Sequence, residues 1–505
     1  MRILVVARYV VALIAMSSAI GLPFCIGQEA KPFIVTAEME RQGQGSEPAF
    51  PLVDLFDVDK NGRLNYSERL AARKHLKDLG KIRKANPRRP FEPATAGPKV
   101  DASNVPIFDK SIPLYAPKVL RTLFLRFEGA DWEEELAAFW HTDVKVDASL
   151  LVDNQRFDNV GVNFRGNSSF TGIPDGSKRS MSLDLDFVED QNLLGHRQLK
   201  LLNANQDPTF LRSVLYLMVA RDYFPTLDAN LVRVVINGES WGIYVNQQTF
   251  SSEFMAERVG APKGTRWKSP NNSIGGGLAY LGEDVELYRR WYEIKGKDSA
   301  KGWNSLIAVC KVLNETPPEQ LEARLKPILD VDQTLKFLAL DMALVNGDGY
   351  WNDGSDFNLY LDSLGVLHLT VHDANEGFRG GRDGSTGPDP LTAMNDEEKA
   401  LRTKLLASPV LRERYLQYVG EIAVKWLDWN RIGPIIGQYE SLIAEEVGKD
   451  SRKHSSTESF RLGLYGNEVN VSTSSIKGFV VKRQAFLLGH PDVIRALTSK
   501  GNQQP

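Results

Sequence analysis

The chain has 505 residues, 42% of them hydrophobic and 25% charged, and its formal net charge at pH 7 is −3. This length is enough for two or more domains, each with a hydrophobic core. The near balance of charge argues against a nucleic acid or another polyanion as the partner of the whole chain.

The first 27 residues are typical of a secretory signal peptide. A basic start is followed by an almost uncharged apolar run over residues 9–26, and Cys25 and Gly27 stand at a possible cleavage site. The alternative is an uncleaved anchor, because the apolar run is close to the length that spans a membrane. Cleavage would leave Cys310 as the only cysteine, which excludes an internal disulfide. We therefore expect an exported protein, periplasmic, cell-surface or secreted, with no membrane span after cleavage.

After a lead that we expect to be disordered (28–50), residues 51–82 predict a calcium-binding EF-hand unit. Residues 57–68 fit the loop pattern D-x-[DN]-x-[DN]-G-x5-E at every defined position, and a helix is predicted over 67–79. Calcium prefers a shell of oxygen ligands, which this spacing supplies. The expected ligands are Asp57, Asp59, Asn61, the backbone carbonyl of Arg63, Asn65 and Glu68. The alternative is an acidic turn that matches the pattern by accident.

A Pro-rich linker is predicted over residues 83–115. The basic stretch that leads into it, 69–89, is interpreted as a solvated helix face, and contact with a phosphorylated or acidic surface is the alternative. Only one EF-hand loop is visible, so the unit is expected to pack on the next domain or to dimerise. Because a linker follows it, we interpret the unit as an accessory module. Removal of residues 28–100 is expected to leave the larger domain folded.

From residue 116 onwards, strand patterns come first and helical patterns later. In the β-rich part, 116–270, the strongest local signal is the hairpin turn Asn237-Gly238. Predicted strands there cover 120–127, 144–152, 160–165, 179–187, 231–236 and 241–247, and predicted helices cover 131–141 and 211–223. From 271 to 495, predicted helices cover 283–294, 303–314, 318–329, 333–345, 397–406, 409–429 and 432–448, with a hairpin of 358–361 and 366–372 and then a tail at 496–505. This order indicates an α+β protein.

A carboxylate, an amide and a second carboxylate follow one another around the predicted hairpin. Asp348 lies in the loop after the apolar helix 333–345, Asn358 opens the first strand, and Asp373 ends the second. Protein kinases use this order: the loop Asp orients the accepting hydroxyl, while the Asn and the later Asp hold magnesium against the phosphates. The sequence has neither the H-R-D nor the D-F-G motif of those enzymes. The alternative is an acidic loop that is only solvated.

Several segments between residues 120 and 378 form an ordered set of motifs, among them V-G-V-N-F-R-G-N-S-S at residues 160–169 and N-A-N-Q-D-P-T-F-L-R at residues 203–212. In these segments the chain resembles the spore-coat protein H (CotH) kinase-like family, which has a G-x-R-x-R-G-N-S strand and turn and an N-x-x-x-D-P-S-x-L-R segment at the corresponding places. Residues 235–244, V-I-N-G-E-S-W-G-I-Y, are similar to its V-N-G-E-Y-W-G-x-Y hairpin. Residues 178–180, K-R-S, and 264–268, G-T-R-W-K, stand where the family has K-K-S and G-x-L-Y-K. No single motif is specific, but their order is.

The resemblance implies an atypical protein-kinase-like domain with a β-rich N-lobe, 116–270, and a helical C-lobe, 271–495. It also implies transfer of the γ-phosphoryl group of ATP to a Ser or Thr of a surface or coat protein, with magnesium as the metal. The residues carried over are Asp348 as the catalytic Asp, Asn358 and Asp373 as magnesium ligands, Lys178 or Arg179 to neutralise phosphate charge, and Arg165 and Lys268 as further nucleotide-binding residues.

Several positions depart from the family pattern. They are His372 for the Trp before the metal-binding Asp, Asn375 for the second Asp of W-D-x-D, Gly347 for the Trp before the catalytic Asp, and Gln247 or Gln248 for the acid after the hairpin. These changes leave a second hypothesis open, a non-catalytic calcium-binding surface or matrix protein that uses the kinase-like fold as a binding scaffold. Residues 379–384 are interpreted either as a substrate loop or as a plain flexible loop.

Overall fold

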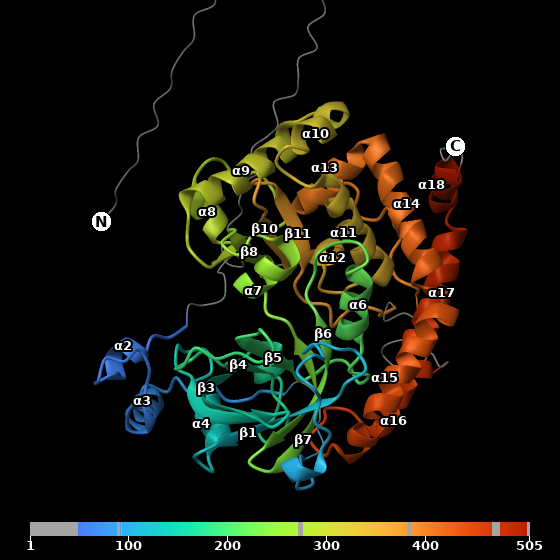
Figure 1. Ribbon diagram of the computed structural model, residues 1–505. Coiled ribbons are helices and arrows are strands. Elements are labelled where there is room, and N and C mark those ends of the chain that lie inside the picture. The colour runs from blue at the N-terminus through green and yellow to red at the C-terminus, as the bar shows by residue number, and fades with distance from the viewer. Residues whose placement is uncertain are drawn as a thin grey trace, which may run out of the picture.

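The computed structural model describes residues 49–87, 91, 93–270, 276–380, 385–466 and 475–501. The expected signal peptide, the expected lead up to residue 48 and residues 381–384 of the arginine-rich loop lie outside the described residues. Figure 1 shows a β-barrel, a second and smaller sheet, and many helices. The predicted α+β class is confirmed.

Seven strands close into a barrel in the order β1-β2-β3-β4-β5-β7-β6. They are β1 (Arg121–Phe127), β2 (Val146–Val152), β3 (Gln155–Phe164), β4 (Met181–Asp184), β5 (Gln198–Leu202), β6 (Ala229–Ile236) and β7 (Glu239–Gln247). Neighbouring strands are antiparallel, except that β1 and β6 run parallel where the barrel closes. The predicted turn at Asn237 and Gly238 joins β6 to β7 with positive φ at both residues, 49° and 79°, as a two-residue hairpin requires.

Short helices connect the strands of the barrel and lead out of it. They are α4 (Trp132–Ala138), α5 (Ser168–Thr171), α6 (Arg212–Ala220), α7 (Ser252–Phe254) and the π-helix η2 (Met255–Val259). The sequence did not predict β5. This strand is only five residues long, and its pairing with β4 on one side and β7 on the other holds it in place. Such stabilisation by distant partners leaves little local signal.

A second, antiparallel sheet has the order β11-β10-β8-β9. Its strands are β8 (Arg266–Ser269), β9 (Glu293–Lys295), β10 (Phe357–Leu361) and β11 (Leu367–Val371), and the predicted β10–β11 hairpin is confirmed. The helix predicted over 283–294 is wrong at its end, because α8 (Val285–Arg289) stops early and β9 pairs with β8. Pairing of Ile294 with Trp267 across these strands takes the place of the expected helical turn.

The remaining helices pack around the second sheet and beside the barrel (Figure 1). Their bounds are η1 (Ala102–Asn104), α9 (Ala300–Glu315), α10 (Pro318–Leu325), α11 (Val331–Leu344), α12 (Tyr350–Asp353), η3 (Glu397–Lys399), α13 (Ala400–Ala407), α14 (Pro409–Lys425), α15 (Trp429–Lys449), α16 (Thr457–Tyr465), α17 (Ile476–Gly489) and α18 (Pro491–Gly501). The tail expected from residue 496 is helical as far as 501. Among the described residues, none of the helices has the length and apolar character needed to cross a membrane.

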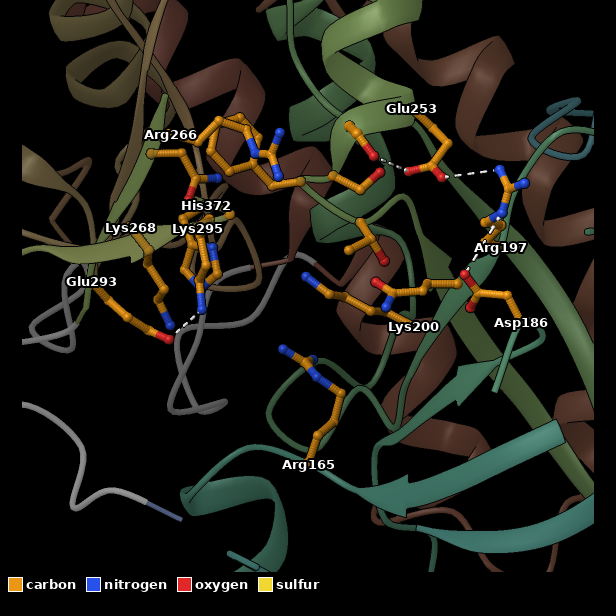
Figure 2. A pocket seen from close by; sticks show the side chains of 17 residues that line it. Arg165, Asp186, Arg197, Lys200, Glu253, Arg266, Lys268, Glu293, Lys295 and His372 are labelled. Atoms are coloured by element: carbon orange, nitrogen blue, oxygen red, sulfur yellow. Dashed lines mark hydrogen bonds and ion pairs between the residues drawn. The ribbon is translucent and has the colours of Figure 1, made fainter. Parts of the chain in front are cut away.

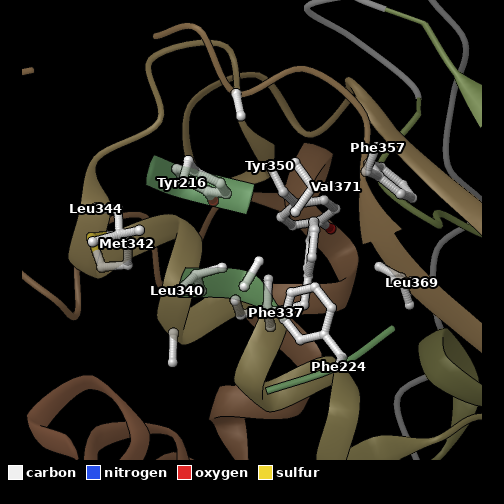
Figure 3. Packing of buried hydrophobic residues seen from close by; sticks show 14 of the residues in the cluster. Tyr216, Phe224, Phe337, Leu340, Met342, Leu344, Tyr350, Phe357, Leu369 and Val371 are labelled. Carbon is white, nitrogen blue, oxygen red and sulfur yellow. The ribbon is translucent and has the colours of Figure 1, made fainter. Parts of the chain in front are cut away.

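Helix α11 is the centre of the larger hydrophobic core. Nearly all of its residues are buried, which is typical of a helix surrounded by other elements. Figure 3 shows Phe337 and Leu340 of α11 in one core cluster with Tyr216 of α6 and Leu369 of β11. This packing fixes the point from which the loop with Asp348 starts.

The N-terminal unit packs directly on the barrel. It consists of α2 (Val53–Phe56), a loop and α3 (Tyr66–Asp78). Arg69 of α3 is almost fully buried, and its guanidinium donates to Glu135 of α4 at 2.9 Å and to Asp147 of β2 at 3.0 Å. The apolar residues of the unit that join one core cluster with the barrel are Leu52, Leu64, Ala72 and Leu76. A unit this small has too little apolar surface for a core of its own.

The predicted linker also lies along the barrel. The Asn86 N–H donates to the Thr171 carbonyl at 2.7 Å, and the Val100 N–H donates to the Gly238 carbonyl at 3.0 Å. Arg121 of β1 donates to three carbonyls, those of Ile112, Pro113 and Leu114. The expectation of a separate accessory module is therefore corrected, because the unit and the segment after it share core and hydrogen bonds with the barrel.

Candidate functional site

The barrel and the second sheet face each other across a cavity of about 490 Å³. From the barrel, Arg165 after β3 and Lys200 of β5 line it; from the second sheet, Lys268 of β8 and Asn358 of β10 line it. Figure 2 shows Arg165 and Lys200 reaching from the barrel side towards Lys268 and Lys295. Both sheets therefore supply side chains to one site.

Basic side chains outnumber acidic ones in this cavity. Arg197 lies 3.6 Å from Asp186 and 3.7 Å from Glu253, and Lys295 pairs with Glu293. These pairs use all the carboxylates of the lining. Within the described part of the chain, the lining bases without a carboxylate at ion-pair distance are Arg165, Lys200, Arg266 and Lys268.

Burial and mutual repulsion shift the pKa values in the cavity. The pKa of Lys200 lies well below its ordinary value, first because of burial and then because of the charges of Arg165, Lys268 and Lys295. Burial and then the same bases, with Lys200, hold the pKa of His372 well below its ordinary value too. Arg165, Lys200 and Lys268 repel one another and have no carboxylate at ion-pair distance among the described residues, which suits an anionic ligand such as a phosphate chain.

Carboxyl groups gather beside the basic cavity. Asp356, just before β10, is 8% exposed and has a left-handed backbone with φ 57°. Burial, and then the charge of Asp373, raises the pKa of Asp356 well above its ordinary value, while Lys268 opposes that rise. Burial, and then the charges of Glu376 and Asp373, raises the pKa of Asp348 to about 7. The structure thus brings Asp348 and Asp373 into one electrostatic cluster with two further acids.

The β10–β11 hairpin positions Asn358 and Asp373. Phe357 faces Val371 across the hairpin, so Asn358 and Asp373 lie at the same end of it. The amide nitrogen of Asn358 donates to the Val371 carbonyl at 3.1 Å, and this bond leaves the amide oxygen for a cation. The Asp373 carbonyl accepts from Asn346 Nδ2 at 2.9 Å, which ties the hairpin to the end of α11.

Asp341 of α11 holds the loop that carries Asp348. Its buried carboxylate accepts from the Trp351 backbone N–H at 3.0 Å, and burial raises the pKa of Asp341 to about 7. Gly349 packs so closely on this carboxylate that a Cβ there would lie 2.1 Å from an Asp341 oxygen. The close approach requires glycine at this position and fixes where Asp348 stands.

The acidic side of the site has oxygen donors that fit a hard cation. Asp373 and Asn358 are two of the residues that supply them. Two more are Asn346 and Asn375, whose side-chain oxygens are buried and have no hydrogen-bond partner among the described residues. Buried acceptors without partners are rare in proteins and require a ligand or a water. Magnesium uses few protein oxygens when phosphates complete its coordination, so this donor set fits magnesium with a nucleotide.

Lys178 and Arg179 are placed away from the cavity lining. Lys178 is completely buried, and its ammonium donates to Asp450 at 2.6 Å and to the Ile243 carbonyl at 2.7 Å. Arg179 donates to Asp175 at 2.7 Å. The resemblance implied that one of the two neutralises phosphate charge. In the structure, Lys178 instead pairs with buried Asp450, and Arg179 pairs with Asp175, whose side chain is 85% exposed. Their adjacent positions on the chain gave no sign of these partners.

Sequence reasoning missed several residues of the site. Lys200 and Lys295 lie on the strands that were not predicted, β5 and β9. Lys200 stands between Leu199 and Leu201, and a single charge in an apolar strand is a signal that points to a special environment. Asp356 was not singled out, because it lies in a loop with several other acids.

The N-terminal loop brings three of its six expected calcium ligands close together. One oxygen each of Asp57, Asp59 and Glu68 lie within 4.8 Å of one another. Glu68 accepts from the backbone N–H groups of Val58 and Asn65, both at 2.8 Å, so its carboxylate already closes the loop from the helix side. Asn65 caps α3 through the Glu68 N–H at 3.2 Å. The structure thus brings three expected ligands together, and the calcium site itself stays a prediction.

Comparison with known proteins gives one family match and two relatives. Residues 162–487, more than half of the chain, match the family described as CotH kinase protein. The curated relatives are "Invasin CotH3" of Rhizopus delemar, 26% identical over 183 residues, and "Invasin CotH2" of the same organism, 26% identical over 178 residues. The alignments cover 35% and 34% of this chain and 30% of each relative. The chain thus spans under a third of the length of these relatives.

Proposed function

We propose that this chain, which belongs to the CotH kinase protein family, transfers the γ-phosphoryl group of ATP to a Ser or Thr hydroxyl of a protein. The observation that carries the proposal is the cavity in which bases without counter-ions adjoin Asn358 and, at the hairpin end, Asp373. In the same proposal, the barrel serves as the N-lobe of a kinase-like domain. The second sheet and its helices serve as the C-lobe.

ATP with magnesium fits the charges of this site. Arg165, Lys200 and Lys268 face the space that a phosphate chain would occupy, and they have no carboxylate partners of their own. Asn358 and Asp373 would hold magnesium, which when bound neutralises charge on the phosphate oxygens. The bases would then neutralise the phosphate chain directly, and Asn358 and Asp373 would do so through the magnesium ion.

Asp348 is the candidate general base of the proposed step. The oxygen of the acceptor hydroxyl forms a bond to the γ-phosphorus, while the bond from that phosphorus to the β,γ-bridging oxygen breaks and ADP leaves with its electrons. The hydroxyl proton moves to Asp348, whose pKa of about 7 suits a base that works near neutral pH. The bases of the cavity would stabilise the negative charge that develops on the leaving phosphate.

A calcium site in the N-terminal loop is a second part of the proposal. The ligand set would be the side chains of Asp57, Asp59, Asn61, Asn65 and Glu68 with the Arg63 carbonyl. The closeness of the three carboxylates and the positive φ of Gly62, 82°, support it. An exported protein meets calcium more readily than a cytosolic one, and weak sites are common in extracellular modules.

Export and a surface partner are proposed on two grounds. Residues 1–27 have the pattern of a secretory signal, and both relatives carry the name invasin, which supports a place at a surface. The acceptor is then a protein of the cell surface or coat.

Asn375 and His372 favour a second candidate function, a binding scaffold without catalysis. Asn375 lacks the charge of the Asp that the family pattern has there. His372 stands where the family pattern has a Trp before the metal-binding Asp, and it lies 3.7 Å from Asp356. In this alternative the cavity binds an anion and transfers nothing.

A titration of the purified chain with ATP and magnesium tests the proposal. Calorimetry should show saturable binding that depends on magnesium, and radiolabelled ATP should label the chain or an added protein. Asp373→Ala should abolish labelling, because it removes a metal ligand. The matched control is Asp362→Ala in the turn of the same hairpin, which should label normally. Binding without labelling would favour the scaffold, and no binding at millimolar ATP would refute both nucleotide roles.

A further inference from the structure

We infer that Lys200 is the lysine that binds the phosphate chain, and that Lys178, which stands in the family's K-K-S position, instead locks the barrel to α15. The inference rests on the proposed nucleotide site and names a residue that neither the motif pattern nor the family match singles out.

The position of Lys200 in the barrel directs its side chain into the cavity. Lys200 is the central residue of β5 and pairs with Ser182 of β4 and Gln247 of β7. Leu199 and Leu201 on either side of it are completely buried in the barrel core. Because neighbouring residues of a strand point to opposite faces, Lys200 points away from that core, and Figure 2 shows it reaching into the cavity.

The surroundings of Lys200 lack a counter-ion. Arg165, Lys268 and Lys295 are the charges that act most strongly on its ammonium, and Asp373 opposes them more weakly. Among the described residues, the Lys200 side chain has no hydrogen bond or ion pair. A half-buried ammonium that shares a cavity with other cations is costly unless an anion joins them. The three donors of Lys200 are therefore available for ligand oxygens.

Lys178, by contrast, has its donors already engaged. It bonds Asp450 and the Ile243 carbonyl, and the rings of Phe210 and Tyr244 lie 4.9 and 5.1 Å from its nitrogen. Both members of the ion pair have side chains that are at most 1% exposed. Asp450 ends α15, so the pair joins the barrel to that helix across 272 residues of sequence.

The Asp450 carboxylate packs directly on strand β7 of the barrel, at a glycine. A Cβ on Gly242 of β7 would lie 2.0 Å from an Asp450 oxygen, so the carboxylate touches the strand itself. Moving Lys178 into the cleft would leave this carboxylate buried and unpaired, which is strongly unfavourable. The geometry gives Lys178 a structural role and leaves phosphate binding to Lys200.

Three lysine-to-methionine variants test the inference in the full chain. Lys200→Met should weaken binding of magnesium ATP about tenfold or more, as loss of a charged hydrogen bond predicts, with little change in melting temperature. Lys178→Met should lower the melting temperature markedly and leave the affinity of the folded protein within about threefold. Lys295→Met is the matched control, because this lysine lines the same cavity but already has Glu293 as partner, and its affinity should change less than that of Lys200→Met.

The outcomes separate the inference from the proposed function. If the wild-type chain binds no magnesium ATP, the proposed nucleotide site fails whatever the variants do. If the wild type binds and Lys200→Met binds equally well, while folded Lys178→Met does not bind, the inference is overturned. Should Lys200→Met fail to fold, Lys200→Gln and Lys200→Arg serve in its place, and only the arginine variant should retain affinity within about threefold.

Discussion

Asp348 shows how neighbouring charges set the chemistry of a single residue. Burial, Glu376 and Asp373 together raise its pKa to about 7 from an ordinary value of 3.8. A carboxyl group accepts a proton only when ionised, so the proposed transfer should be lost as pH falls through about 7 and should level off above it. The rate of phosphate transfer against pH measures this directly, and Asp348→Asn should lower that rate about a hundredfold or more while magnesium ATP still binds.

Glu376→Gln is the companion variant for this pH profile. It removes the acid that acts most strongly on Asp348 and frees Arg379, its ion-pair partner, so the pKa of Asp348 falls and the acid limb should move to lower pH. A limb that already lies near pH 4 in the wild type, or that Glu376→Gln leaves in place, would contradict the role of Asp348.

Residue roles were predictable from sequence where the chain itself sets the spacing. Asn358 and Asp373 belong to one hairpin, whose turn and strand residues are local signals. Lys178 and Lys200 were not distinguishable in this way, because the face that each presents depends on how the barrel closes. Asp450, the partner of Lys178, lies on a helix far along the chain, and no local pattern connects them.

Helix α3 shows at the scale of elements how a small unit is held on a larger one. Arg69 and Glu135 form an ion pair in which both side chains are 4% exposed. Removing one partner of such a pair leaves a buried charge alone, so Arg69→Met should lower the free energy of unfolding by about 3–5 kcal/mol. Arg73→Met is the matched control on the same helix. Its partner Asp131 is 43% exposed, and its loss should cost under about 1 kcal/mol.

Urea denaturation of the two variants measures this difference. The double variant Arg69→Met with Glu135→Leu should recover part of the loss, because neither charge is then left buried. Equal effects of Arg69→Met and Arg73→Met would show that α3 is not anchored through its buried arginine.

Elements with strong local signals were predictable, and those made by pairing were not. The β6–β7 hairpin follows from Asn237-Gly238, and α11 follows from a continuous apolar run. Strands β5 and β9 are short and owe their place to partners distant in sequence. Packing of the N-terminal unit on the next domain was one of two alternatives that the sequence left open, but the partners on α4 were not predictable, because Glu135 lies far along the chain from Arg69.

At the scale of the whole molecule, calcium binding to the N-terminal loop should raise the stability of the barrel. Glu68, the last expected ligand, is followed directly by Arg69, which pairs with Glu135 of α4 and Asp147 of β2, and Leu64 of the loop belongs to the barrel's core cluster. A ligand that binds only the folded state stabilises it, by about 2.7 kcal/mol at a concentration of a hundred times the dissociation constant. Because loop and barrel share one core, that stabilisation should reach the barrel.

Differential scanning calorimetry with calcium or with a chelator measures this linkage. The transition that melts the barrel should move upward by several degrees in calcium, since about 1 kcal/mol shifts a domain of this size by roughly 2–4 °C. Asp59→Ala should remove the shift with little effect on the calcium-free protein, because Asp59 is exposed and outside the core. A small separate transition that alone responds to calcium would mean that the N-terminal unit unfolds independently, against the shared core that the structure shows.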